Sequence, residues 1–298
     1  MTFDRSYLVC ATQRSGSTLL CELLKDTGVA GRPEEYFEAR RDTGSPPHPG
    51  DYLGSLPPTG AGIRSDPRPP EAPPYSSLHG LNGYRCHLDR TFALGTTPNR
   101  VFGAKLMWRQ LPELQALAGT LPEYAGLEIH ELLDRLLCGP AYIWVSRADK
   151  VRQAVSMWRA LQSRRWRAGA PTAAGRGPEL VYSFEGIDHL AETFEAEDRS
   201  WGAFFADHGI SPLRLSYEDD LERDRDATVH AVLHRLGITP PAGWHAPEPT
   251  ARQADALSED WVVTYHRDRA LRGGRPARTA STAADAGPGS APVPARDR

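Results

Sequence analysis

The sequence of 298 residues contains little cysteine and no long apolar segment. Its four cysteines, at positions 10, 21, 86 and 138, form no CxxC pair and have no metal-ligand spacing. This pattern indicates a reduced, cytoplasmic protein and gives no reason to expect a metal. The apolar run at residues 7–11 is too short for a signal-peptide core, and far shorter than a membrane span of about 20 residues. We therefore expect no membrane span.

The sequence also lacks a basic excess. It has 35 lysines and arginines against 38 aspartates and glutamates, which gives a formal net charge of −3. A dedicated nucleic-acid-binding protein would concentrate positive charge on one surface. We therefore expect no nucleic-acid partner.

Short apolar segments alternate with amphipathic segments along most of the chain, which predicts a parallel sheet. Strands are predicted at 7–11, 101–107, 141–145 and 213–217, and helices at 19–28, 129–137, 149–166, 187–207 and 221–236. Residues 43–74 are rich in proline and glycine, so regular structure is not expected there. The expected fold class is α/β, a P-loop-like parallel sheet flanked by helices on both faces. We predict one domain at 1–272 and a disordered tail at 273–298, where few residues are able to build a core.

The segment between the first predicted strand and the first predicted helix is suited to binding an anion. Backbone N–H groups at the start of a helix point outward and the helix dipole adds positive charge. Gly16 allows close backbone approach, and Arg14 supplies a fixed positive charge. Further donors come from the hydroxyl groups of Ser15, Ser17 and Thr18. An ordinary capped turn is the alternative interpretation.

Two well-known phosphate loops are absent. GxxxxGK[ST] would require a lysine where Ser17 stands, and GxGxxG does not occur. An ATP-dependent small-molecule kinase would therefore have to lack its defining loop. It remains as one alternative function, and a non-catalytic nucleotide-binding module is another.

A second anion site is predicted after the third strand. Arg147 follows that strand directly, and Ser156 lies on the following helix. A donor with phosphates at both its 5′ and its 3′ position needs two such sites.

These residues resemble the phosphate-binding motifs of PAPS-dependent sulfotransferases, where PAPS is 3′-phosphoadenosine 5′-phosphosulfate. Five segments are similar to the trehalose 2-sulfotransferase family of actinobacterial type: YLVCATQRSGSTLL, TGVAGRPEEYF, VFGAKLMW, SRADKVRQAVSMWRALQSRRWR and RQADALSEDWVVTYHRD. The resemblance implies a sulfotransferase fold, PAPS as co-substrate, a sugar hydroxyl as acceptor and a homodimer. It departs from the superfamily in one place: Ser156 follows Arg147 by nine residues instead of eight, and the usual proline is missing.

The resemblance also implies roles in catalysis. It makes Glu35 the general base, while Glu34 is expected to point elsewhere. Arg14 would stabilise charge on the bridging oxygen, and Lys105 would assist it or hold the acceptor. A histidine base ranks second; His79 and His87 lie in a stretch predicted to be irregular.

The acceptor is implied to be trehalose or a related disaccharide. Residues 40–100 match the family poorly, so a glycosylated natural product is the alternative. Five side chains of one predicted helix suggest a sugar-binding face, and a buried core helix is the alternative. They are Trp158, Arg159, Gln162, Arg165 and Trp166. Arg252 and Gln253 are expected to close over the nucleotide.

Overall fold

The computed structural model describes residues 3–38, 50–53, 81–164, 179–248 and 256–273. The predicted tail, apart from its first residue, and most of the proline-rich stretch lie outside these residues. So do His79, Arg165, Trp166, Arg252 and Gln253.

A sheet of four parallel strands forms the centre of the fold, with β1 in the interior of the sheet. The strands are β1 (Arg5–Ala11), β2 (Val101–Met107), β3 (Ala141–Ser146) and β4 (Leu213–Ser216), in the order β2-β1-β3-β4. Leu8 of β1 is in register with Ala104 on one side and with Tyr142 on the other. Because all strands run the same way, their carboxyl ends share one edge, where ligands bind in open α/β sheets.

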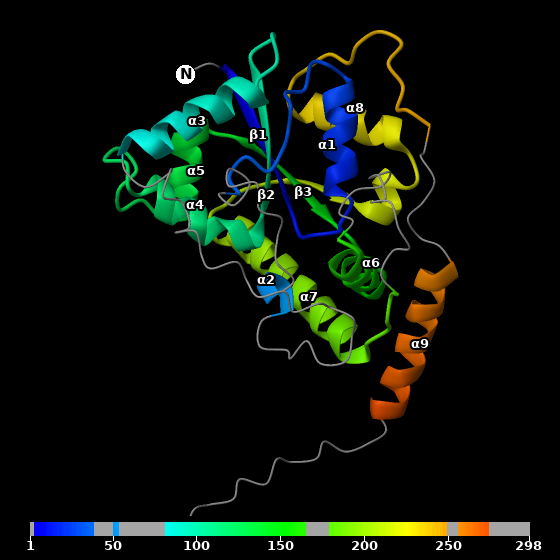
Figure 1. Ribbon diagram of the computed structural model, residues 1–298. Helices are drawn as coiled ribbons and strands as arrows, with labels where there is room; N and C mark the ends of the chain where they lie inside the picture. Colours follow the sequence, from blue (N-terminus) through cyan, green and yellow to red (C-terminus); the bar gives the residue numbers. More distant parts are fainter. Residues whose placement is uncertain (1–2, 39–49, 54–80, 165–178, 249–255, 274–298) are drawn as a thin grey trace, which may run out of the picture.

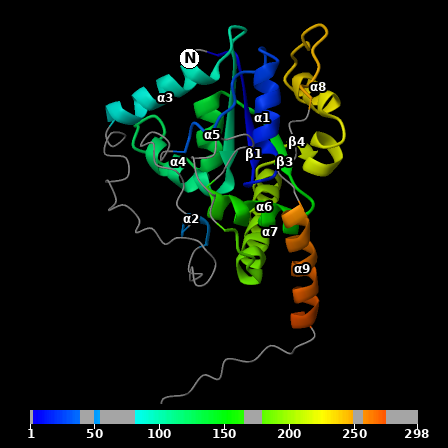
Figure 2. The same cartoon turned by 45° about the vertical axis from the view of Figure 1, so that its right-hand side comes forward.

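Helices cover both faces of the sheet (Figures 1 and 2), which confirms the predicted architecture. They are α1 (Ser17–Asp26), α2 (Gly50–Leu53), α3 (Leu81–Gly95), α4 (Leu111–Ala118), α5 (Ile129–Leu137), α6 (Lys150–Ser163), α7 (Phe184–Asp207), α8 (Arg225–Arg235) and α9 (Ala256–Gly273). Two short turns, η2 (Trp108–Gln110) and η3 (Tyr217–Leu221), follow β2 and β4.

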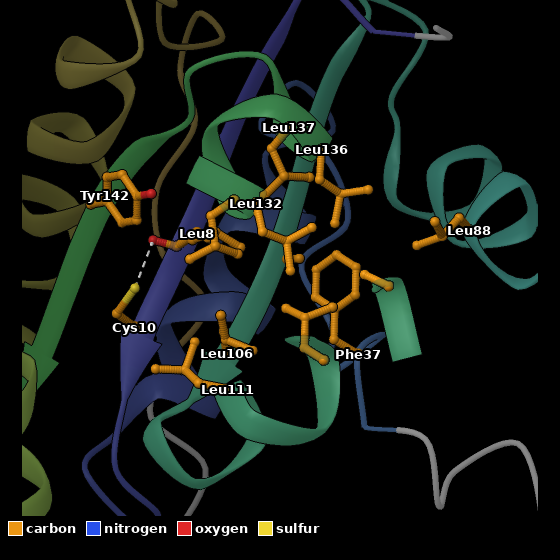
Figure 3. Close-up of a cluster of buried hydrophobic side chains, with 14 of the residues drawn as sticks. Leu8, Cys10, Phe37, Leu88, Leu106, Leu111, Leu132, Leu136, Leu137 and Tyr142 are labelled. Atoms are coloured by element: carbon orange, nitrogen blue, oxygen red, sulfur yellow. Dashed lines mark hydrogen bonds between the residues drawn. The ribbon is translucent and has the colours of Figure 1, made fainter. Parts of the chain in front are cut away.

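The alternation of side chains along β1 divides the core between the two faces. Leu8 and Cys10 pack with α3, α4, α5 and the end of α7, and Figure 3 shows Leu8, Leu106 and Leu132 in this cluster. Tyr7 and Val9 face α1 and α8 on the other side. A third cluster joins α6, α7 and α9 beneath the carboxyl ends of the strands (Figure 1).

Some elements differ from the sequence prediction. The predicted strand at 213–217 ends at Ser216, and Tyr217–Leu221 forms a wide helical turn before α8. The helices α2, α3, α4 and α9 were not predicted, and α2 lies within the 43–74 stretch where regular structure was not expected. His87 therefore lies within α3 and not in an irregular stretch, because Tyr84 and Leu88 are buried against the sheet side of the core. Within the described part of the chain, no helix has the length and apolar character needed to cross a membrane.

Candidate active site

The loop between β1 and α1 has a backbone that only glycine accommodates at its centre. Gly16 has φ +91°, and a Cβ atom there would lie 2.5 Å from Cδ2 of Tyr217. Arg14 also has positive φ, at 63°. The Ser15 hydroxyl is buried and makes no hydrogen bond within the described residues. An unpartnered buried donor beside the start of α1 fits an anionic group.

Three residues predicted to bind phosphate converge beside this loop. The Arg14 Nε atom donates a hydrogen bond of 2.9 Å to Oγ of Ser156, and the Arg147 Nη1 atom donates one of 3.5 Å to the Arg14 carbonyl oxygen. Burial, and then repulsion from Arg147, lowers the pKa of Arg14 to about 10. The nine-residue spacing is therefore compatible with Ser156 facing the loop. The two guanidinium groups form a concentration of positive charge that a bound anion would offset.

The side chain of Arg147 is held by η3, a contact that sequence reasoning missed. Its guanidinium lies over the Tyr217 ring, 4.7 Å from the ring centre, and its Nε atom is 3.4 Å from Glu218 Oε1. Glu218 also accepts a hydrogen bond of 2.9 Å from the backbone N–H of Ala148. Burial opposes ionisation of Glu218. The backbone N–H groups of Ala148 and Asp149 and the charge of Arg147 outweigh burial and lower the pKa of Glu218. Tyr217 thus touches both Gly16 and Arg147 and joins the two anion-binding elements.

A second group of polar side chains links the loop to Glu35. The Lys105 Nζ atom lies 2.8 Å from Glu35 Oε1 and donates a hydrogen bond of 2.9 Å to Thr18 Oγ1. Gln110 of η2 donates to the other carboxylate oxygen of Glu35, at 3.0 Å. The side chains of Lys105 and Glu35 are 3% and 14% exposed. Lys105 is therefore a buried, ion-paired lysine and not a solvated group at a strand end.

Backbone pairing determines which of the two adjacent glutamates reaches this group. The backbone N–H of Lys105 donates to the carbonyl oxygen of Glu34 at 2.9 Å, so this segment lies along β2. The Glu34 side chain points to Lys25, at 2.6 Å. Glu35, the next residue, then faces the Lys105 side chain.

The predicted sugar-binding face of α6 is wrong for two of its members. Trp158 and Gln162 are 3% and 6% exposed, and both side chains donate to the carbonyl oxygen of Val181. The Trp158 ring also lies against Gly186, where a Cβ atom would come within 2.5 Å. These residues therefore join α6 to α7, as the core-helix alternative expected. Arg159 bonds to Ser258 of α9.

His87 has a contact that explains it structurally. Its Nε2 atom lies 3.0 Å from the carbonyl oxygen of Tyr36, and its ring stacks on Tyr84. Neither contact gives it a role as a base.

A cavity of about 130 Å³ opens beside Gln13, the residue before Arg14. Arg109 of η2 and Glu197 of α7 supply its charged groups. Sequence patterns offered little indication of it, because Arg109 and Glu197 resemble surface charges until α7 is placed under the sheet edge. The only signal was the position of Arg109 just after a buried strand.

A parallel sheet with a glycine-containing loop after its inner strand, next to a buried lysine–glutamate pair, gives an α/β fold with a candidate anion-binding site. Comparison with known proteins identifies its class. A family model described as Stf0 sulphotransferase matches residues 6–268. The chain belongs to this family and is a sulfotransferase.

Two curated relatives are both named trehalose 2-sulfotransferase. Trehalose 2-sulfotransferase of Mycobacterium tuberculosis (strain ATCC 35801 / TMC 107 / Erdman) is 38% identical over 266 residues, which cover 89% of this chain and 95% of that protein. Trehalose 2-sulfotransferase of Mycolicibacterium smegmatis (strain ATCC 700084 / mc(2)155) is 37% identical over 273 residues, 91% of this chain and 97% of that protein.

Proposed function

We propose that this sulfotransferase moves the sulfuryl group of PAPS to a hydroxyl of trehalose or a related glycoside, with Glu35 as general base. The observation that carries the proposal is the continuous contact from Thr18 through Lys105 to Glu35. It connects the anion loop directly to a carboxylate able to accept a proton. The names of the two relatives support trehalose as the first acceptor to test.

The residues present suit a donor with two phosphate positions. The first turn of α1, the unpartnered Ser15 hydroxyl and Arg14 would hold the 5′ phosphosulfate. Ser17 and Thr18 begin the same helix. Arg147 and Ser156 would hold the 3′ phosphate, and each already contacts Arg14. A bound anion would also relieve the repulsion between the two arginines.

PAPS, when bound, supplies the sulfuryl group and a phosphate as leaving group. Glu35 takes the proton of the acceptor hydroxyl as that oxygen bonds to sulfur and the bond from sulfur to the phosphate oxygen breaks. Arg14 stabilises the negative charge left on the phosphate oxygen. A metal is not required, because lysine and arginine side chains supply the positive charge.

Lys105 would couple these two events. Before reaction its charge is balanced by the carboxylate 2.8 Å away. When Glu35 accepts a proton, that balance is lost while Lys105 remains hydrogen-bonded to Thr18 at the loop. The positive charge then becomes available to the departing phosphate at the moment when it is needed.

Thermal unfolding tests the donor and mass spectrometry tests the reaction. PAP, the 3′,5′-bisphosphate product, at about 100 times its dissociation constant should add roughly 2.7 kcal/mol of stability. ATP with magnesium should add none, whereas the reverse pattern would favour a kinase. Incubation with PAPS and trehalose should yield a monosulfated disaccharide. A protein that binds PAP but sulfates no glycoside would contradict the proposed acceptor.

The homodimer implied by the resemblance is tested separately, by light scattering.

A further inference from the structure

A buried glutamine of α6 holds the main chain of the loop between β1 and α1. The side chain of Gln153 is 0% exposed. Its Nε2 atom donates to the carbonyl oxygen of Gln13 at 2.6 Å and to Oγ1 of Thr12 at 2.8 Å. The amide thus uses both of its N–H groups where β1 ends and the loop begins. Because Gln13 directly precedes Arg14, the bond to its carbonyl oxygen fixes the backbone from which the Arg14 side chain extends.

A lysine at the start of α6 holds the main chain at the second predicted phosphate site. The Lys150 Nζ atom donates to the carbonyl oxygen of Arg147 and lies 3.4 Å from Oε1 of Gln153. The same atom pairs with Oδ2 of Asp198, on the neighbouring helix α7 (Figure 1), and the two side chains are 14% and 13% exposed. Asp198 therefore anchors the lysine, and the lysine anchors the backbone of Arg147.

The contact between Lys150 and Gln153 joins these two branches, so one network holds the backbone at both predicted phosphate sites. A fully buried glutamine in a helix is costly unless its hydrogen bonds are made, and an apolar side chain would avoid that cost. Buried polar networks whose members are satisfied specify one arrangement of the elements that they join. Here the arrangement that they specify is that of the loop relative to the start of α6.

The distance between the two sites needs a restraint that a bound phosphate does not displace. The predicted phosphate ligands also contact one another, from Arg14 to Ser156 and from Arg147 to the Arg14 carbonyl oxygen. Those contacts use guanidinium donors, which a bound anion would attract to itself. The amide of Gln153 is instead bonded to protein groups that carry no charge, so its bonds can remain when both sites are filled.

We propose that Gln153 and Lys150 are positioning residues that fix the distance between the loop and Arg147, and so select a nucleotide with phosphates at both its 5′ and its 3′ position. The inference rests on the proposed function, and both residues act through backbone carbonyl groups. A nucleotide with one phosphate is able to follow the loop if the loop shifts, whereas a nucleotide with two must meet both sites at once. Loss of the restraint should therefore weaken the binding of the second kind of ligand selectively.

The test is calorimetric titration of Gln153→Met with PAP and with AMP, which carries the 5′ phosphate alone. Methionine keeps the length of the side chain and removes both donors. PAP affinity should fall by about tenfold or more, because a charged hydrogen bond to the 3′ phosphate is misaligned. AMP affinity should change little, so the ratio of the two affinities falls with it.

Gln162→Met is the matched control, because Gln162 is also a buried glutamine of α6 bonded to backbone groups. Its partners are the carbonyl oxygen and the N–H of Val181, away from the loop. This variant should lower the unfolding midpoint as Gln153→Met does, since each leaves buried backbone groups without partners. It should bind PAP and AMP with wild-type affinities.

The double variant Lys150→Met with Asp198→Asn tests the other branch. It removes one positive and one negative charge, so no buried charge is left without its partner and the net charge is unchanged. The bond to the Arg147 carbonyl oxygen is lost, and the ratio of PAP affinity to AMP affinity should fall here as well. Thermal unfolding of each variant shows whether it is folded, and if Gln153→Met is not, the double variant decides.

A folded variant that keeps the wild-type ratio of the two affinities would overturn the inference. Equal losses for PAP and AMP would also overturn it, because the network would then support the loop alone and not the distance between the sites. A wild-type protein that binds PAP no more tightly than AMP would instead contradict the two-phosphate donor of the proposed function, and that result is seen before any variant is made.

Discussion

Lys105 and Glu35 form an ion pair of 2.8 Å whose two side chains are 3% and 14% exposed. A buried pair of this kind is costly to break, because removal of one partner leaves an uncompensated charge. It adds little stability relative to well-packed neutral side chains. Lys105 also donates a hydrogen bond to Thr18 of the loop, and we therefore propose that the pair is kept for catalysis.

Replacement of Lys105 by methionine should destabilise the protein by about 3–5 kcal/mol, because Glu35 is then buried without its partner. The double variant Lys105→Met with Glu35→Gln should recover much of that stability and remain inactive. Chemical denaturation and sulfate transfer measure the two effects. A double variant as unstable as Lys105→Met alone would show that packing, and not charge, determines the loss.

Replacement of Glu35 by glutamine should lower kcat by about 10²- to 10⁴-fold, the usual contribution of a general base. PAP binding should be retained, because glutamine keeps the shape and the contact with Gln110. Glu34→Gln is the control: it removes only the partly exposed pair with Lys25, which is worth about 1 kcal/mol or less. Equal losses of kcat in the two variants would contradict the assignment of Glu35.

Replacement of Gly16 by alanine should abolish PAP binding. Alanine at φ +91° costs about 1–2 kcal/mol, and its Cβ would also press into the Tyr217 ring at 2.5 Å. Gly28→Ala is the control, because Gly28 has φ +70° but open space around it. That variant should show the backbone cost in its unfolding midpoint without losing the stabilisation by PAP.

Replacement of Arg147 by glutamine should weaken PAP binding by at least about tenfold, since a charged hydrogen bond to phosphate contributes about 1.5–3 kcal/mol. The free protein should lose little stability, because repulsion between Arg147 and Arg14 is relieved at the same time. Arg223→Gln makes the same change of charge at an exposed position and is the control. Calorimetric titration with PAP distinguishes them, and equal affinities would argue against a 3′-phosphate site at Arg147.

The sheet was predictable because buried parallel strands are nearly continuous apolar runs, as VFGAKLM in β2 is. The loop between β1 and α1 was predictable because a short apolar run is followed by glycine and hydroxyl residues and then by a helical pattern. Its binding of an anion stays a prediction. α3 was missed since Gly83 and several polar residues weaken its pattern, and only packing of Tyr84 and Leu88 makes it a helix.

The contacts within the site were beyond the reach of sequence reasoning from the residues. Glu35 became a candidate through family resemblance, and its pairing with Lys105 depends on the backbone bond that lays residue 34 along β2. The Trp158 error has a similar cause. A helical pattern gives the spacing of aromatic side chains but not which face the neighbouring helix covers, and α7 covers this one.

The stability of the protein should depend on pH through Glu197. Its pKa is about 7 in the folded protein against 4.5 for an ordinary glutamate, so the folded state holds this proton more tightly. The contribution of this group to stability is therefore complete below pH 4.5 and is lost as the pH rises toward 7. The gap corresponds to an upper bound of about 3 kcal/mol. Arg109 from η2 and Asp198 on α7 are the charged neighbours that act on it.

Glu197→Gln should therefore raise the unfolding midpoint at pH 8, where the wild-type protein must bury a carboxylate, and change it little at pH 5. Glu192→Gln, on the exposed side of α7, should show no such difference between the two pH values. Equal midpoints for wild type and variant at pH 8 would mean that Glu197 is not buried as a charge, and its place in the cavity would then need another explanation.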